Sequence, residues 1–132
     1  MNAFIVEMEN RPGEIARIAA AIAEKGINIT NAAGLAVGMS GGFGFTTNDE
    51  AGTRSALDSI GCQYREIQLL PISMEDRPGA LADATRRLAD AGINVEFLAP
   101  AGMSGGRMTV AIGVENIDAA RSALGELAAA RA

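Results

Sequence analysis

The feature that most constrains this chain is an internal repeat. The string Glu9-Asn10-Arg11-Pro12-Gly13, followed by Gly26-Ile27-Asn28, returns 66 residues later as Glu75-Asp76-Arg77-Pro78-Gly79 and Gly92-Ile93-Asn94. Nine of the 21 positions between 9 and 29 are identical in the copy, without a gap. A repeat of this kind sets the fold. It predicts two units, residues 1–66 and 67–132, that share one architecture.

Composition narrows the class of protein. Apolar residues make up 48% of the 132 positions and charged residues 20%, which is typical of a globular chain. The apolar stretches are too short to cross a membrane, and the N-terminus lacks the basic region of a secretory signal. The net charge of −5 and the pI of about 4.7 disfavour nucleic acid as a partner, because phosphate binding needs clustered Lys and Arg. We therefore expect a cytoplasmic protein.

Hydrophobic periodicity predicts the elements of repeat 1. Apolar residues alternate from Phe4 to Met8, which indicates a strand with one buried face. Apolar side chains then recur at helical spacing between Ile15 and Ile22. Strands over 27–37 and 43–47, a turn over 38–42, a helix from about Asn48 and a strand from Cys62 complete the order β-α-β-β-α-β.

Repeat 2 follows the same course, and Met103-Ser104-Gly105-Gly106 repeats Met39-Ser40-Gly41-Gly42. Its second helix is expected to run through residues 128–132, which leaves no residues for a fourth strand. The predicted fold class is α+β: two tandem ferredoxin-like (βαββαβ) units with helices on one face of antiparallel sheets, the second unit lacking its last strand.

The segment from Cys62 to Glu75 must supply both the last strand of repeat 1 and the first strand of repeat 2. With no flexible linker, the units are expected to be rigidly joined. Pro71 lies within this segment, and proline in a sheet prefers an edge. An edge left by the missing strand favours pairing between two copies of the chain.

The residues of catalytic sites are scarce. The sequence has no His, which excludes acid–base catalysis and metal ligation by that side chain. A single cysteine, Cys62, cannot form a zinc site of thiolate pairs and is expected as a buried strand residue. We predict no catalytic residues, no metal site, no cofactor and no enzymatic activity. The glycine-rich segment 38–44 lacks the Lys-Ser/Thr of a phosphate loop; a hairpin turn and a ligand-covering loop both remain open.

The loop from Asn10 to Gly13 is the strongest candidate site. It joins a strand to a helix, and helix N-termini attract anions through free N–H groups and a partial positive charge. Gly13 permits close approach to the backbone, and the amides of Asn10 and Asn28 offer both donors and acceptors. These groups suit the α-carboxylate and α-ammonium of an amino acid. In the alternative interpretation, Asn10 and Asp76 are helix caps and Arg-Pro-Gly is only a turn.

These motifs, at fixed spacing and present twice, resemble the ACT domain, a small-molecule regulatory module of amino-acid metabolism. The resemblance covers nearly the whole chain, which is similar to the small stand-alone tandem-ACT proteins. It implies binding of an amino acid at interfaces between ACT units, sheets paired side by side in a homodimer, and a metabolic enzyme or regulator as partner. An ACT module that has lost its ligand and serves only in structure or protein interaction is the alternative.

Repeat 1 closely resembles the serine-sensing ACT unit of phosphoglycerate dehydrogenase. The resemblance implies ligand contacts from Asn10 and, across an interface, Asn28. The corresponding residues of repeat 2 are Asp76 and Asn94. Met8 and Met74 stand where the serine sensor has His, which favours a more apolar contact. The candidate ligand-binding residues are Met8, Asn10, Arg11, Pro12, Gly13, Glu14, Ile15, Asn28, Met74, Asp76, Arg77, Pro78, Gly79, Ala80, Leu81 and Asn94.

Overall fold

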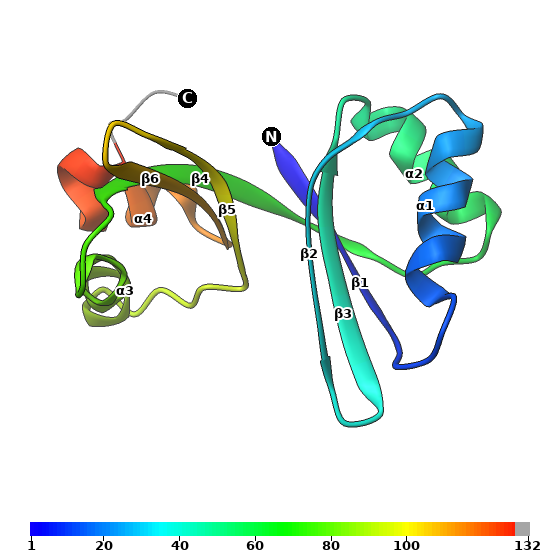
Figure 1. Ribbon diagram of the computed structural model, residues 1–132, viewed down its shortest axis with the longest axis horizontal. Coiled ribbons are helices and arrows are strands. Elements are labelled where there is room, and N and C mark those ends of the chain that lie inside the picture. The colour runs from blue at the N-terminus through cyan, green and yellow to red at the C-terminus, as the bar shows by residue number, and fades with distance from the viewer. Residues whose placement is uncertain (129–132) are drawn as a thin grey trace. The chain divides into compact units, whose positions relative to one another are not determined.

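The computed structural model describes residues 1–128, and the chain divides into two compact units (Figure 1). Unit 1 spans Met1–Ile67, and unit 2 begins at Gln68. Both units combine helices with antiparallel strands. The α+β class predicted from the repeat is confirmed.

Unit 1 has the expected order of elements. They are β1 (Asn2–Glu9), α1 (Glu14–Glu24), β2 (Ile29–Val37), β3 (Ser40–Thr47), α2 (Glu50–Ser59) and the start of β4 (Arg65–Glu75). The strands lie in the order β2-β3-β1, with β4 next to β1. Helices α1 and α2 lie together on one face of these strands (Figure 1).

Unit 2 uses the rest of β4 as its first strand. It continues with α3 (Ala80–Asp90), β5 (Phe97–Ser104), β6 (Arg107–Val114), α4 (Ile117–Leu124) and a short 3₁₀ helix (Gly125–Leu127). The strand order is β4-β6-β5. The α-helix expected to continue into 128–132 ends at Leu124, before this 3₁₀ helix, and residues 129–132 lie outside the described part of the chain.

A single strand, β4, therefore serves both repeats, as the short interval between them required. Residues 68–75 of this strand pair with β6. Pro71 faces Ala111 in that ladder, and within unit 2 β4 is the outer strand. In the complete strand order β4 is flanked by β1 and β6, so the expected edge position of Pro71 holds only for unit 2 taken by itself.

Two boundaries differ from the expected ones. The turn between β2 and β3 contains only Gly38 and Met39, because β3 already begins at Ser40. Gly41 and Gly42, expected in the turn, pair instead with Met8 and Glu7 of β1. The strand expected from Cys62 begins at Arg65. Glycine favours a turn, but strand β3 is paired with β1 on one side and β2 on the other. This pairing overrides the turn tendency of Gly41 and Gly42.

Each unit has its own apolar core. In unit 1 the alternating residues Phe4 and Val6 of β1 meet Phe45 of β3 and Ile18 and Ile22 of α1, and all five are at most 1% exposed. The rings of Phe4 and Phe45 stack with centroids 5.8 Å apart. Unit 2 builds the same layer from aliphatic side chains, such as Leu70, Ile72, Leu88 and Ile112.

An ion pair joins α2 to β4, and a hydrogen bond extends this contact to the start of β1. Arg54 donates from Nε and Nη2 to the two carboxylate oxygens of Glu66, at 2.7 and 2.8 Å. Asn2 donates to the same carboxylate at 3.0 Å. The hydrogen bonds from Arg54, and then that from Asn2, hold the pKa of Glu66 below its ordinary value of 4.5, against the opposing effect of burial.

This ion pair predicts loss of stability in acid. A carboxylate whose pKa is lower in the folded state stabilises the fold above its unfolded pKa, and that contribution disappears as the pH falls through the folded pKa. Glu66→Gln should unfold more easily at pH 7 by about 1 kcal/mol and should lose less stability between pH 5 and pH 3 than the parent. Urea denaturation across this range measures both. Glu24→Gln, at the exposed end of α1, is the control, and equal pH slopes for parent and Glu66→Gln would contradict the prediction.

Candidate functional site

The loop between β1 and α1 ends in a helix N-terminus that no side chain caps. Gly13 is the N-cap of α1, with φ of 92°, and no side chain bonds the first turn. Gly79 repeats this arrangement at α3, with φ of 87°. By contrast, Asp49 accepts from the N–H of Gly52 at the start of α2, and Asn116 accepts from that of Ala119 at α4. The alternative that Asn10 and Asp76 are helix caps is therefore wrong.

A cavity of about 330 Å³ lies beside the uncapped end of α1. This volume is at the lower end of the range for small-molecule sites. Among the candidate residues of repeat 1, the cavity is lined by Met8, Asn10, Arg11, Gly13, Glu14 and Ile15. The structure thus brings six of the eight together, while Pro12 and Asn28 do not line the cavity.

Sequence reasoning missed the sheet side of this cavity. Its remaining lining residues are Glu9, Ala16, Gly34, Leu35, Ala36 and Gly41. Gly41 of β3 faces Met8 on one side and Ala36 on the other, and directly opposed residues of antiparallel strands point to the same face. The cavity exists because glycine and alanine occupy this face where larger side chains would fill it. Gly34 inside the expected strand 27–37 was the available signal, and the assignment of Gly41 to a turn concealed its partner.

Charged groups of the loop pair with one another. Arg11 lies 3.2 Å from the carboxylate of Glu9 and 3.0 Å from that of Glu14. The hydrogen bond to Glu14 raises the pKa of Arg11, with the charges of Glu14 and Glu9 adding to it. Arg17 approaches Glu14 to 3.7 Å. The Glu14 side chain is only 12% exposed, so these cations balance a largely buried carboxylate at the helix start.

Asn10 ties the loop to the β2–β3 turn. Its side-chain amide donates to the carbonyl of Gly38 at 3.0 Å, and its backbone N–H donates to the carbonyl of Met39 at 2.9 Å. The side-chain oxygen accepts no hydrogen bond in either contact. The site is thus joined directly to the tip of an exposed hairpin.

Asn28 lies elsewhere in unit 1. Its backbone N–H donates to the side-chain oxygen of Asn48 at 3.0 Å, and its carbonyl accepts from the Asn48 backbone N–H at 3.2 Å. The Asn28 residue is exposed. The sequence assigned its ligand contact to a facing unit, and that contact stays a prediction.

Unit 2 builds its loop differently. The backbone N–H of Asp76 donates to Gly106, but an ionised Asp76 has no side-chain donor for the turn. Met74 and Ala80 are buried, whereas Asp76, Pro78, Gly79, Leu81 and Asn94 are exposed. A cavity of about 270 Å³ involves Met74, Arg77 and Ala80, and it lies toward α3 and the 3₁₀ helix, with Arg87, Glu126 and Leu127 in its wall.

The strand registers explain the difference between the units. Met8 faces Gly41, whereas its counterpart Met74 faces Met108. Met108 in turn faces Met103, where unit 1 has Ala36 facing Gly41. Larger side chains therefore occupy the positions that leave space in unit 1. The shared Met-Ser-Gly-Gly string is not structurally equivalent, because Gly105 and Gly106 form the turn between β5 and β6.

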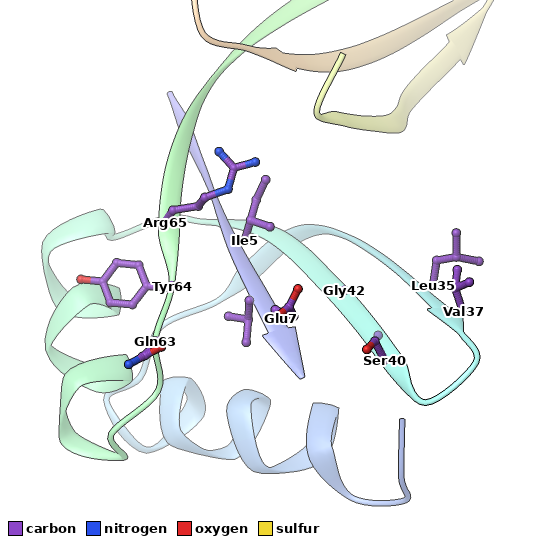
Figure 2. Close-up of a pocket in the computed structure, with 11 residues that line it drawn as sticks. Ile5, Glu7, Leu35, Val37, Ser40, Gly42, Gln63, Tyr64 and Arg65 are labelled. Carbon is purple, nitrogen blue, oxygen red and sulfur yellow. The ribbon is translucent and has the colours of Figure 1, made fainter. Parts of the chain in front are cut away.

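A second cavity of unit 1, of about 550 Å³, lies on the opposite face of the sheet. Ile5 and Glu7 of β1 point to this face (Figure 2), because they alternate with the core residues of that strand. Leu35 and Val37 of β2 stand at its far end (Figure 2). This cavity contains none of the Asn10–Gly13 loop.

Cys62 lines neither cavity of unit 1. Cys62 is half-buried in the segment before β4 and not in a strand as expected. Burial raises the pKa of its thiol, which lowers its reactivity. Among residues 1–128, no group of three or more His, Cys, Asp or Glu could hold a metal ion.

A family model described as the ACT domain matches residues 3–57 and 68–129. The chain belongs to the ACT-domain family. Two tandem ACT units are therefore present, as the repeat indicated. No curated protein matches the chain. Among residues 1–128, no helix of this ACT pair is both long and apolar enough to span a membrane.

Solved structures share the fold of this ACT pair. A protein from Bacteroides thetaiotaomicron is 21% identical, with a TM-score of 0.74 over 95% of this chain and 86% of that chain. The regulatory subunit of aspartate kinase from Thermus thermophilus, in its ligand-free form, is 23% identical, with a TM-score of 0.67 over 96% and 91%. The corresponding subunit from Thermus flavus is 22% identical, with a TM-score of 0.65 over 96% and 92%.

The left-handed glycine at the start of α1 predicts a stability effect. A Cβ at Gly13 would meet no atom within 4 Å, so the cost of Gly13→Ala comes from its φ of 92° alone, about 1–2 kcal/mol. Gly42→Ala is the matched control, because a Cβ there also meets nothing within 4 Å and Gly42 has no positive φ. Urea denaturation should show a lower midpoint for Gly13→Ala only. Equal midpoints for the two variants would show that the loop relaxes.

Proposed function

We propose that this chain is a non-catalytic regulatory protein that senses an amino acid. The ligand occupies the cavity of unit 1 beside α1. The observation that carries the proposal is the uncapped helix N-terminus opening onto a cavity of ligand size. Membership of the ACT-domain family supports it, as does the likeness in fold to regulatory subunits of aspartate kinase.

The chemistry of the cavity suits a zwitterion. The N–H groups of the first turn of α1 receive the α-carboxylate, because the helix dipole favours negative charge there. The side-chain oxygen of Asn10 and the carboxylate of Glu9 receive the α-ammonium. Met8, Arg11, Gly13, Glu14 and Ile15 line the pocket, Pro12 belongs to the loop that carries them, and Asn28 or Asn94 closes the pocket from across an interface.

The two repeats contribute unequally. The loop of repeat 2 carries Asp76, which can only accept hydrogen bonds when ionised, and methionines occupy its sheet face. The residues Met74, Arg77, Pro78, Gly79, Ala80 and Leu81 form a loop that is structural or has a different ligand preference. Repeat 1 is the primary site.

The signal passes to a partner that acts in amino-acid metabolism, an enzyme or a regulator in the cytoplasm. Ligand contact at the side-chain oxygen of Asn10 orients the amide whose nitrogen donates to Gly38. Binding therefore acts on the hairpin that carries Leu35, Val37 and Met39, all at least 74% exposed. Such exposed apolar residues also favour the alternative function, an interaction module that works without a ligand.

A screen of the twenty amino acids by thermal shift tests ligand binding on the intact chain. A ligand that binds only the folded state adds about 2.7 kcal/mol of stability at one hundred times Kd. Asn10→Ala should weaken the best ligand by about 0.5–1.5 kcal/mol in calorimetry, and Asp76→Ala, the matched change in repeat 2, should leave it unaltered. The opposite result would assign the ligand to repeat 2. Absence of any stabilising amino acid would favour the interaction module.

We also propose a homodimer formed through β2. This strand lies at the end of the strand order and contains no buried, charged or proline residue. An edge without charge, proline or cover pairs readily with another chain. Val37 and Leu35 are each 74% exposed, which provides apolar area for the contact.

Light scattering at micromolar concentration should give twice the monomer mass of 13.5 kDa. Val37→Lys should return the chain to the monomer, since it places a charge on the edge. Leu98→Lys, on β5 of unit 2 and 39% exposed in the parent, is the control that should stay dimeric. A monomeric parent, or a dimeric Val37→Lys, would refute this interface.

A further inference from the structure

The sheet side of the cavity in unit 1 is apolar. Met8, Gly34, Ala36 and Gly41 provide this floor, and Ile15 of α1 lies opposite them. The polar lining residues Glu9, Asn10, Arg11 and Glu14 all lie between the last residue of β1 and the first residue of α1. The cavity therefore has one polar end and one apolar end.

The main-chain groups of Gly41 on the floor already take part in the sheet. Gly41 lies in β3, which is hydrogen-bonded to β1 on one side and to β2 on the other. A hydroxyl or charge placed there would lose its water without gaining a partner, which is costly. A ligand side chain that reaches the floor is consequently apolar.

The two glycines determine how much space this side chain has. A Cβ on Gly34 would lie 3.6 Å from Cδ1 of Ile15 and 3.7 Å from Cδ1 of Phe43. A Cβ on Gly41 would lie 3.6 Å from Cε of Met8. These are ordinary contact distances, so the protein could hold alanine at either position. The missing methyl groups leave room between the sheet and Ile15, which is 43% exposed.

We propose that the ligand is an amino acid with a small aliphatic side chain, of the valine and leucine class. This inference rests on the proposed function, since it requires that the α-carboxylate and α-ammonium occupy the polar end. The side chain then enters the space above Gly34 and Gly41 and covers Ile15 and Met8. Repeat 2 offers no equivalent space at Met103 and Met108.

Calorimetry on the intact chain with glycine, L-alanine, L-valine, L-leucine, L-threonine and L-aspartate tests the proposal. Affinity should rise about fourfold for each buried methyl or methylene group. Valine and threonine have the same shape, so their ratio reports the polarity of the floor alone. We expect valine to bind at least tenfold more tightly, as in other apolar pockets that meet a hydroxyl isostere.

Gly34→Ala adds one methyl group at the floor and should weaken leucine about tenfold while changing alanine little. Gly42→Ala is the matched control, because Gly42 lies on the neighbouring strand β3 and does not line this cavity. Circular dichroism verifies that both variants fold.

Valine preference together with selective loss of leucine in Gly34→Ala would support the inference. Equal binding of valine and threonine, preference for aspartate, or unaltered leucine binding in Gly34→Ala would overturn it and leave the sensing function intact. Absence of binding by any of the twenty amino acids would instead remove the proposed function, and this inference with it.

Discussion

The first turn of an α-helix has main-chain N–H groups that find no partner within the helix. The four α-helices of the described chain differ in how they treat these groups. Asp49 and Asn116 cap α2 and α4 with side-chain oxygens, whereas α1 and α3 follow Gly13 and Gly79 and receive no side-chain cap. The Arg-Pro-Gly loops thus leave anion-attracting groups at the ends of β1 and β4. The ligand site that we propose depends on the N–H groups in the first turn of α1.

An uncapped helix end becomes a site only where space lies beside it. Both units have the helix end, but their sheet faces differ in the size of a few side chains. Gly41 and Ala36 leave a cavity in unit 1, and Met108 and Met103 occupy the corresponding positions in unit 2. The two units therefore share the fold but differ in where the cavity lies beside the loop: toward β2 and β3 in unit 1, and toward α3 and the 3₁₀ helix in unit 2. Protein interiors are usually close-packed, so the space beside Gly41 and Ala36 is the feature that distinguishes unit 1.

The loop of unit 1 from Asn10 to Gly13 is also connected to an exposed surface. Asn10 bridges the loop to the carbonyls of Gly38 and Met39 at the tip of the β2–β3 hairpin. The Asp76 side chain cannot reproduce the amide donation in unit 2. The side-chain oxygen of Asn10 takes part in neither contact, so a ligand can bind it while the amide nitrogen keeps its bond to Gly38. The same residue can therefore sense the ligand and restrain the surface that meets a partner.

The sequence by itself determined the repeat, the order of the elements, the cores and the loops that could bind an anion. These features follow from local rules: alternation at Phe4, Val6 and Met8, helical spacing from Ile15 to Ile22, and Arg-Pro-Gly after the first strand of each repeat. Each of these rules depends on residues that are close together in the sequence, so one sequence is enough to recognise it.

The tertiary structure decided which loop has a cavity, what lines it and where Asn10 donates. Gly34, Ala36 and Gly41 became site residues only through the strand registers, which pair positions far apart in sequence. The repeated Met-Ser-Gly-Gly string was misleading for the same reason. Its two glycines lie within strand β3 in unit 1 and in the turn between β5 and β6 in unit 2. Register depends on the summed hydrogen bonds and packing of whole strands, and no local pattern contains that sum.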